Sequence, residues 1–263
     1  MALPARSGHH SCGWNMRSLA LARFAASLSH PAPGPSYAAV MIRLYHCVSA
    51  RSFRALWAME ELGLPYGLVM LPFPPRQHAR DFLEVNPLGT IPLLVHDETR
   101  MTESAAICQY LCSLVPGTSL ELRPGDADYG SFLNMLHFGE ATLTFPQTLV
   151  LRYSRFEPEH RRQPGVAEDY AKWFLARLRT LEPRLTRERH LCAGRFTMAD
   201  ISVGYALMLA EYLDLRPRFT PAVAAYWQGL RERPAYHRAL EAQHAAAIAQ
   251  GVSVVPAPLA TGG

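Results

Sequence analysis

The sequence predicts a small α/β domain followed by an all-helical domain. In residues 41–118, short apolar runs such as MIRLYH alternate with helix-periodic segments, and this order predicts a mixed sheet with helices on its faces. From about residue 126 to residue 250, almost every segment places apolar side chains three and four residues apart, as packed helices do. A chain of 263 residues that is 49% hydrophobic can bury a core of this size.

The expected elements of the first domain follow one another closely. MIRLYH is a strand, residues 51–62 form a helix that Gly63 and Pro65 close, and YGLVMLPF is a second strand. A proline-rich loop and a short helix near ARDFLEV precede the strand IPLLVHD, a turn and the strand RMTES. A helix from Ala105 to about Leu114 completes the domain.

Four segments of the second domain have helical periodicity: DYGSFLNMLHFGEATL, VAEDYAKWFLARLRTLEPRL, MADISVGYALMLAEYL and AVAAYWQGLRERPAYHRALEAQ. Thr197 and Asp200, three residues apart before the third segment, predict a capping box, and Phe196 with Ile201 predicts a hydrophobic staple. Such a cap stabilises a helix by about 0.5–2 kcal/mol, so the motif is structural.

The two ends of the chain differ from the body. Residues 1–40 contain three arginines and no acid, show no sustained periodicity, and are expected to be an irregular leader, a targeting segment or a stretch upstream of the native start. Residues 251–263, GVSVVPAPLATGG, are expected to form a flexible tail. No run of eighteen apolar residues occurs, which argues against a membrane-spanning helix.

Charge and cysteine content narrow the class of function. The formal net charge is +4, and removing the three leader arginines leaves +1, which argues against a nucleic-acid partner. The five cysteines are odd in number and include no CxxC pair, which indicates a reducing, cytoplasmic compartment. Cys108 and Cys112 lie one helical turn apart, but no further ligand stands nearby, so we expect no metal site.

The turn between the first strand and the first helix, residues 47–50, is the first candidate site. Unpaired N–H groups and the helix dipole stabilise a thiolate or another anion at such a place. Ser49 is the best N-cap candidate, whereas Cys47 is either a nucleophile of low pKa or a buried apolar residue. Ser52 falls inside the first helical turn, and Arg51 and Arg54 are expected to be surface or interdomain charges.

A second candidate site lies in NPLGTIPLL and the following TES. Pro92 pushes Ile91 into an extended conformation, which leaves the backbone N–H and C=O of Ile91 available. The peptide bond between Ile91 and Pro92 can be cis. Glu103 and Ser104 stand at the start of a helix, where they can serve simply as first-turn acid and cap. Together with Ile91 they offer an extended backbone for a peptide and helix-start donors for its carboxylate.

The stretches YHCVSARSFRALWAMEELGLPY, NPLGTIPLL, ESAAICQYL and FTMADISVGYAL, in this order and spacing, resemble the cytosolic glutathione S-transferases, especially bacterial members close to the theta and zeta types. The resemblance spans about residues 41–250. It implies a thioredoxin-like N-terminal domain and an all-helical C-terminal domain. It also implies a homodimer that uses glutathione as co-substrate, needs no other cofactor, and acts on a hydrophobic electrophile.

Carried over by motif, the resemblance assigns the ends and centre of glutathione. Ile91 pairs its backbone with the cysteinyl part, and Pro92 is a cis proline that holds this backbone. Glu103 and Ser104 hold the γ-glutamyl amine and carboxylate. His78 matches a position that often reaches the glycyl carboxylate, although an exposed loop histidine is an equal alternative.

The resemblance places the activating serine at Ser49, whose hydroxyl would lower the thiol pKa from about 8.5 toward neutrality. The turn departs from the family pattern, since many bacterial relatives have serine and proline where this chain has Cys47 and Val48, and a further serine in place of Ala50. Should Cys47 face the sulfur instead, disulfide reduction or deglutathionylation would replace conjugation.

The electrophile is expected between the domains, against the turn and the first long helix of the second domain. The candidate contacts are mostly apolar: Tyr129, Leu133, Leu136, His137, Glu140 and Phe145. The main hypothesis is a glutathione transferase. The alternative from another class is a non-catalytic protein of the same fold that binds partners or apolar ligands, which is disfavoured because the glutathione-binding set looks complete.

Overall fold

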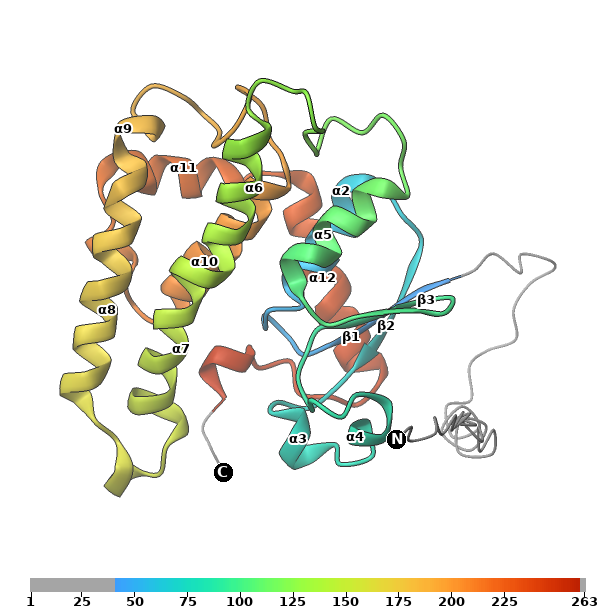
Figure 1. Ribbon diagram of the computed structural model, residues 1–263. Helices are drawn as coiled ribbons and strands as arrows, with labels where there is room; N and C mark the ends of the chain where they lie inside the picture. Colours follow the sequence, from blue (N-terminus) through green and yellow to red (C-terminus); the bar gives the residue numbers. More distant parts are fainter. Residues whose placement is uncertain (1–40, 261–263) are drawn as a thin grey trace, which may run out of the picture. The chain divides into compact units, whose positions relative to one another are not determined.

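Four strands form one mixed sheet in the computed structural model, which describes residues 41–260 (Figure 1). The predicted leader, residues 1–40, and the last three residues lie outside the described part. The strands are β1 Ile42–His46, β2 Tyr66–Met70, β3 Leu93–His96 and β4 Thr99–Met101, in the order β2-β1-β3-β4. β1 is parallel to β2 and antiparallel to β3, with Leu44 opposite Leu68 on one side and Leu94 on the other.

Two helices pack together against this sheet, α2 Phe53–Leu62 and α5 Ser104–Ser113 (Figure 1). Gly63 ends α2 in the left-handed conformation, φ 64°, as predicted from its position. The proline-rich loop carries α3 Pro75–His78 and α4 Phe82–Val85, of which only α4 was expected. Two peptide bonds of this region are cis, Phe73–Pro74 and Ile91–Pro92.

Every further element of the described chain is helical. The α-helices are α6 Tyr129–His137, α7 Phe145–Leu151, α8 Pro164–Leu178, α9 Glu182–Leu185, α10 Met198–Tyr212, α11 Pro221–Arg231 and α12 Pro234–Ala249. The π-helical segment η1 Phe138–Thr144 joins α6 to α7 in one rod, and a second π-helical segment, η2 Arg152–Phe156, follows α7. The short 3₁₀ segments are η3 Glu159–Arg161, η4 Arg179–Leu181, η5 Arg216–Arg218 and η6 Ala257–Leu259.

Helix α10 is the centre of the helical domain. Every residue from Met198 to Ala210 is buried, as expected of a helix that is apolar on all sides. The predicted capping box is confirmed, because Thr197 accepts from the amide of Ala199 and Asp200 accepts from the amide of Thr197 at 2.9 Å. Together with the element order, this confirms the predicted fold class, a thioredoxin-like domain followed by an all-helical one.

Within the segment predicted to be a flexible tail, residues 251–260 are described, and they contact the body of the protein at Ala257 and Pro258. The amide of Ala257 donates to the carbonyl of Val48 at 2.7 Å, and Arg155 donates to the carbonyl of Pro258 at 3.0 Å. Ala257 and Pro258 are buried. Burial of these two apolar residues beside the first turn offsets part of the chain entropy that is lost when the segment is ordered.

No helix of residues 41–260 is sufficiently long and apolar to cross a bilayer.

Candidate active site between sheet and helices

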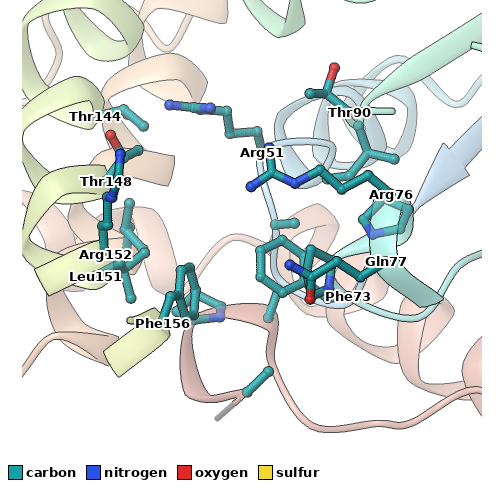
Figure 2. Close-up of a pocket in the computed structure, with 18 of the residues that line it drawn as sticks. Arg51, Phe73, Arg76, Gln77, Thr90, Thr144, Thr148, Leu151, Arg152 and Phe156 are labelled. Atoms are coloured by element: carbon teal, nitrogen blue, oxygen red, sulfur yellow. The ribbon is translucent and has the colours of Figure 1, made fainter. Parts of the chain in front are cut away.

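A cavity of about 800 Å³ separates the proline-rich side of the sheet domain from the helical domain. Figure 2 shows Phe73, Arg76, Gln77 and Thr90 on one side, facing Thr144, Thr148, Leu151, Arg152 and Phe156 on the other. The lining also includes Ala50, Arg51, Gly89, Ile91, Tyr205, Leu209, Ala257, Pro258 and Ala260. The site thus combines apolar walls with three arginines and several backbone and hydroxyl groups.

Ser49 does not face this cavity, contrary to the expectation that its hydroxyl meets the glutathione sulfur. Its backbone is left-handed, φ 55°, and its side chain is 1% exposed. The hydroxyl lies 3.1 Å from that of Tyr212 and accepts from Gln243 at 3.2 Å, while the Ser49 amide donates to Gln243 Oε1 at 2.8 Å. The left-handed backbone and these contacts with α10 and α12 turn the side chain inward, so it caps no helix.

Cys47 is also turned away from the cavity. Its sulfur lies 3.8 Å from the carbonyl of Pro72, and it packs in an apolar cluster with Leu71, Phe82 and Ala257. Burial raises the pKa of the Cys47 thiol far above its ordinary value. The alternative interpretation, a buried apolar residue, therefore describes Cys47, and the nucleophile interpretation has no support in the structure.

The turn instead presents Ala50 and Arg51 to the cavity. Ala50 offers no side-chain donor, whereas the Arg51 guanidinium forms an ion pair with Glu140 of η1 at 2.8 Å and remains 39% exposed. In Figure 2, Arg51 extends from the turn toward the helical wall that carries Thr144. The group that this turn offers to a ligand is a cation rather than a hydroxyl or a thiol.

Arg54, one helical turn further on, is completely buried and joins the two domains. Its guanidinium forms an ion pair with Glu140, lies 4.3 Å from the centre of the Tyr205 ring, and donates to Ser202 O (3.1 Å), Ser104 Oγ (3.2 Å), Gly139 O (3.2 Å) and Thr144 Oγ1 (2.7 Å). Of the two expectations for this residue, the interdomain one is confirmed. Its burial escaped sequence reasoning, because nothing local distinguishes Arg54 from Arg51.

Ile91 lines the cavity next to its cis bond with Pro92, as the resemblance implies. Within residues 41–260, no hydrogen bond engages the backbone N–H or C=O of Ile91. The loop before it is fixed by Asn86, which donates to Thr90 O at 2.8 Å and accepts from the amide of Leu88. Asn86 was missed from the sequence; its place in NPLGT, ahead of a glycine with φ 59°, is the available signal of a built turn.

The other predicted glutathione contacts do not line the cavity. Glu103 is exposed at the start of α5, and Ser104 is buried beneath it with its hydroxyl on Arg54. His78 is exposed and does not line the cavity, whereas its neighbours Arg76 and Gln77 do. The exposed-histidine alternative therefore describes His78.

The predicted electrophile contacts do not line the cavity. Leu133 and His137 line a separate shallow hollow with Phe138, Phe145 is 52% exposed on the surface, and Tyr129 packs against the core. The remaining two candidates, Leu136 and Glu140, are respectively fully buried and paired with arginines. The wall is formed further along the chain by Thr144, Thr148 and Leu151, and the π-helical segment η1 changes the helical period between the predicted contacts on α6 and these residues.

Comparisons with known proteins agree with this architecture. A family model described as glutathione S-transferase, N-terminal domain, matches residues 48–114. Glutathione S-transferase 3 of Schizosaccharomyces pombe is 33% identical over 214 residues, which cover 76% of this chain and 87% of that protein.

Two solved structures show the same similarity. A glutathione transferase of Methylococcus capsulatus superposes with a TM-score of 0.69 at 26% identity, covering 77% of this chain and 98% of that one. A sphingomonad glutathione S-transferase complexed with glutathione gives 0.67 at 26% identity, with 76% and 98% covered. The theta or zeta subtype stays a prediction. The chain belongs to the glutathione S-transferase family of enzymes.

Proposed function

We propose that this transferase binds glutathione in the cavity between its domains and adds the glutathione thiolate to a hydrophobic electrophile. The observation that carries the proposal is the backbone of Ile91, which is unpaired within the described chain and lies beside a cis proline on the cavity wall. An extended peptide with a free N–H and a free C=O is complementary to the unpaired backbone of Ile91. The cysteinyl residue of glutathione has these groups, and the sphingomonad relative is a complex with glutathione.

With the cysteinyl part at Ile91, the two ends of glutathione extend in opposite directions from that residue. The γ-glutamyl end extends beyond the cavity to the start of α5, where Glu103 is exposed and Ser104 lies beneath it. Because the Ser104 oxygen accepts from Arg54, its O–H remains able to donate to a carboxylate. Arg76 and Gln77 of α3, rather than His78, take the glycyl carboxylate, since these two line the cavity.

The remaining space suits an apolar co-substrate. It is lined by apolar side chains: Phe73, Phe156, Leu151, Leu209 and Pro258. The cavity volume of about 800 Å³ lies within the range of small-molecule sites, roughly 300–1,000 Å³. The sulfur attacks the electrophilic carbon, a C–S bond forms, and the leaving group departs with the electron pair of its bond. This chemistry needs glutathione as co-substrate and no resident cofactor or metal.

We also propose that the protein is a homodimer. The support is the hollow on α6 and η1 lined by Leu133, His137 and Phe138, with Phe145 exposed further along the rod. Sedimentation of the wild type and of Phe138→Glu checks this. A dimeric wild type and a monomeric variant support the contact, whereas a monomeric wild type contradicts it.

The test of function uses one sample in three assays: glutathione titration by calorimetry, conjugation of 1-chloro-2,4-dinitrobenzene, and glutathione-dependent disulfide reduction. We expect binding and conjugation. Disulfide reduction is not favoured, because Cys47 is buried with a raised pKa. Absence of binding at millimolar glutathione contradicts the proposal, and binding without conjugation supports a non-catalytic binding protein instead.

Two neighbouring variants sharpen the assignment of the glycyl end. Arg76→Ala removes a charged hydrogen-bond donor from the cavity wall, so the dissociation constant of glutathione should rise about tenfold or more. His78→Ala changes the same short helix outside the cavity and should leave the constant within about twofold. A larger effect for His78→Ala contradicts the placement.

A further inference from the structure

With Ser49 and Cys47 turned inward, the cavity contains no hydroxyl or thiol at the turn where the family resemblance puts the activating group. We propose that Arg51 is the catalytic residue that stabilises the glutathione thiolate, and that Glu140 positions it. The proposal rests on the proposed function, since it concerns the same bound glutathione.

Arg51 has the required location. It lines the cavity together with Ile91, which would pair with the cysteinyl backbone, so the thiol of that residue points into the space that Arg51 enters. The backbone N–H groups of Arg51 and Ser52 make no hydrogen bond within residues 41–260. Arg51, at the start of α2, therefore brings a guanidinium and a backbone amide without a partner to the cavity wall, an arrangement that favours an anion.

The charge of the surrounding cluster supports the same conclusion. One carboxylate, Glu140, is shared between Arg51 and the buried Arg54, so these three groups carry a net charge of +1. Arg54 is held by four further hydrogen bonds and by the face of Tyr205 and cannot turn away from its partners. Glu140 therefore fixes Arg51 in place without neutralising the cluster, and an anion in the cavity completes the balance.

Other charges that face the cavity do not substitute for this cluster. Arg152 of η2 is paired with Glu157 at 2.8 Å, and Glu157 also faces the space. Arg76 lies on the wall assigned to the glycyl end. Arg51 is thus the cation that the turn itself supplies, at the end where the sulfur lies.

The chemical step is electrostatic. Arginine stays protonated in proteins, so Arg51 neither accepts the thiol proton nor returns it. The proton of the glutathione thiol passes to water, the thiolate is held by the guanidinium, and its electron pair then forms the C–S bond as the leaving group departs.

The test measures the pKa of the bound thiol from thiolate absorbance at saturating glutathione, for the wild type, Arg51→Gln and Arg51→Lys. An opposite charge within about 4–6 Å lowers a pKa by about 1–3, and partial exposure favours the low end. We therefore expect Arg51→Gln to raise the thiol pKa by about one, which is a tenfold loss of conjugation rate below that pKa. Arg51→Lys should retain part of the effect.

A matched control removes a positive charge from the wall that is assigned to the glycyl end of glutathione. Arg76→Gln should weaken glutathione binding while moving the thiol pKa less than Arg51→Gln does. For the positioning role, Glu140→Gln is measured alone and in the Arg51→Gln background, with folding checked by circular dichroism. If Glu140 acts through Arg51, its effect on the thiol pKa falls by at least half in the double variant.

Three results overturn the proposal. Arg51→Gln with unchanged binding and unchanged thiol pKa assigns the thiolate to another group. Weaker glutathione binding with an unchanged pKa of the bound thiol makes Arg51 a carboxylate ligand rather than a catalytic residue. A wild type that does not bind glutathione refutes the proposed function and this inference together, and that result is distinct from the other two.

Discussion

Replacing the buried Arg54 should destabilise the whole protein, because this one side chain holds α2, α5, η1 and α10 together. Arg54→Met keeps an unbranched chain in the same space and removes only the guanidinium. Two of the groups it leaves retain a partner. Gly139 O still accepts from Thr144 at 2.8 Å, and Glu140 still pairs with Arg51.

The magnitude follows from the groups that lose their charged donor. Ser104 Oγ and Ser202 O are buried, and each such loss costs about 1–3 kcal/mol. Breaking a buried ion pair costs about 3–5 kcal/mol, and the 23% exposure of Glu140 favours the lower part of that range. These contacts belong to one side chain, so their costs are not additive and the ion-pair value sets the scale. We therefore expect the free energy of unfolding to fall by about 3–4 kcal/mol, or the Tm by about 10 °C at this chain length.

Urea denaturation and calorimetry of the purified chain measure this loss. The matched control is Arg51→Met, which removes the exposed partner of the same carboxylate and should cost no more than about 1 kcal/mol. If Arg54→Met unfolds within 1 kcal/mol of the wild type, or if the two variants lose equal stability, the reasoning about the buried arginine is refuted.

Three further predictions concern the turn and its neighbours. Burial lowers the pKa of His46 from 6.5 to about 4, so the contribution of neutral His46 to the free energy of unfolding is complete above pH 6.5 and falls by roughly 2–3 kcal/mol by pH 4.5. His46→Asn should abolish this pH dependence in urea denaturation, and an equal pH dependence in both proteins contradicts the prediction. Ser49→Ala should cost about 1 kcal/mol of stability through the lost contacts with Tyr212 and Gln243, and it should lower the conjugation rate less than Arg51→Gln does. A larger rate loss in Ser49→Ala than in Arg51→Gln would return the activating role to Ser49. A chain that ends at Gly251 lacks Ala257, which packs against Cys47, so the Cys47 thiol should react with a disulfide reagent at least tenfold faster than in the full chain. Equal reaction rates would show that the C-terminal segment does not protect this thiol.

The fold was predictable because its signals are local. Strand and helix periods, Gly63 after α2 and the Thr197–Asp200 capping box are each read within a few residues, and the structure has all of them. Pro92 likewise marked the edge that lines the cavity.

The site was predictable only in part, because side-chain direction depends on distant contacts. Ser49 turns inward through its left-handed backbone and through Gln243, which lies 194 residues further along the chain. Arg51 and Arg54 have the same chemistry and almost the same position in sequence, yet one lines the cavity and the other is the most buried charge at the domain junction. The π-helical segment η1 shifts the helical wall in a way that an α-helical period does not reveal.

The most direct test of the account is a crystal structure with glutathione bound. We predict the sulfur within about 4–6 Å of the Arg51 guanidinium, the cysteinyl backbone paired with Ile91, and Ser49 still bonded to Gln243. A sulfur in hydrogen-bond contact with Ser49 Oγ, or joined to Cys47 in a disulfide, would contradict it.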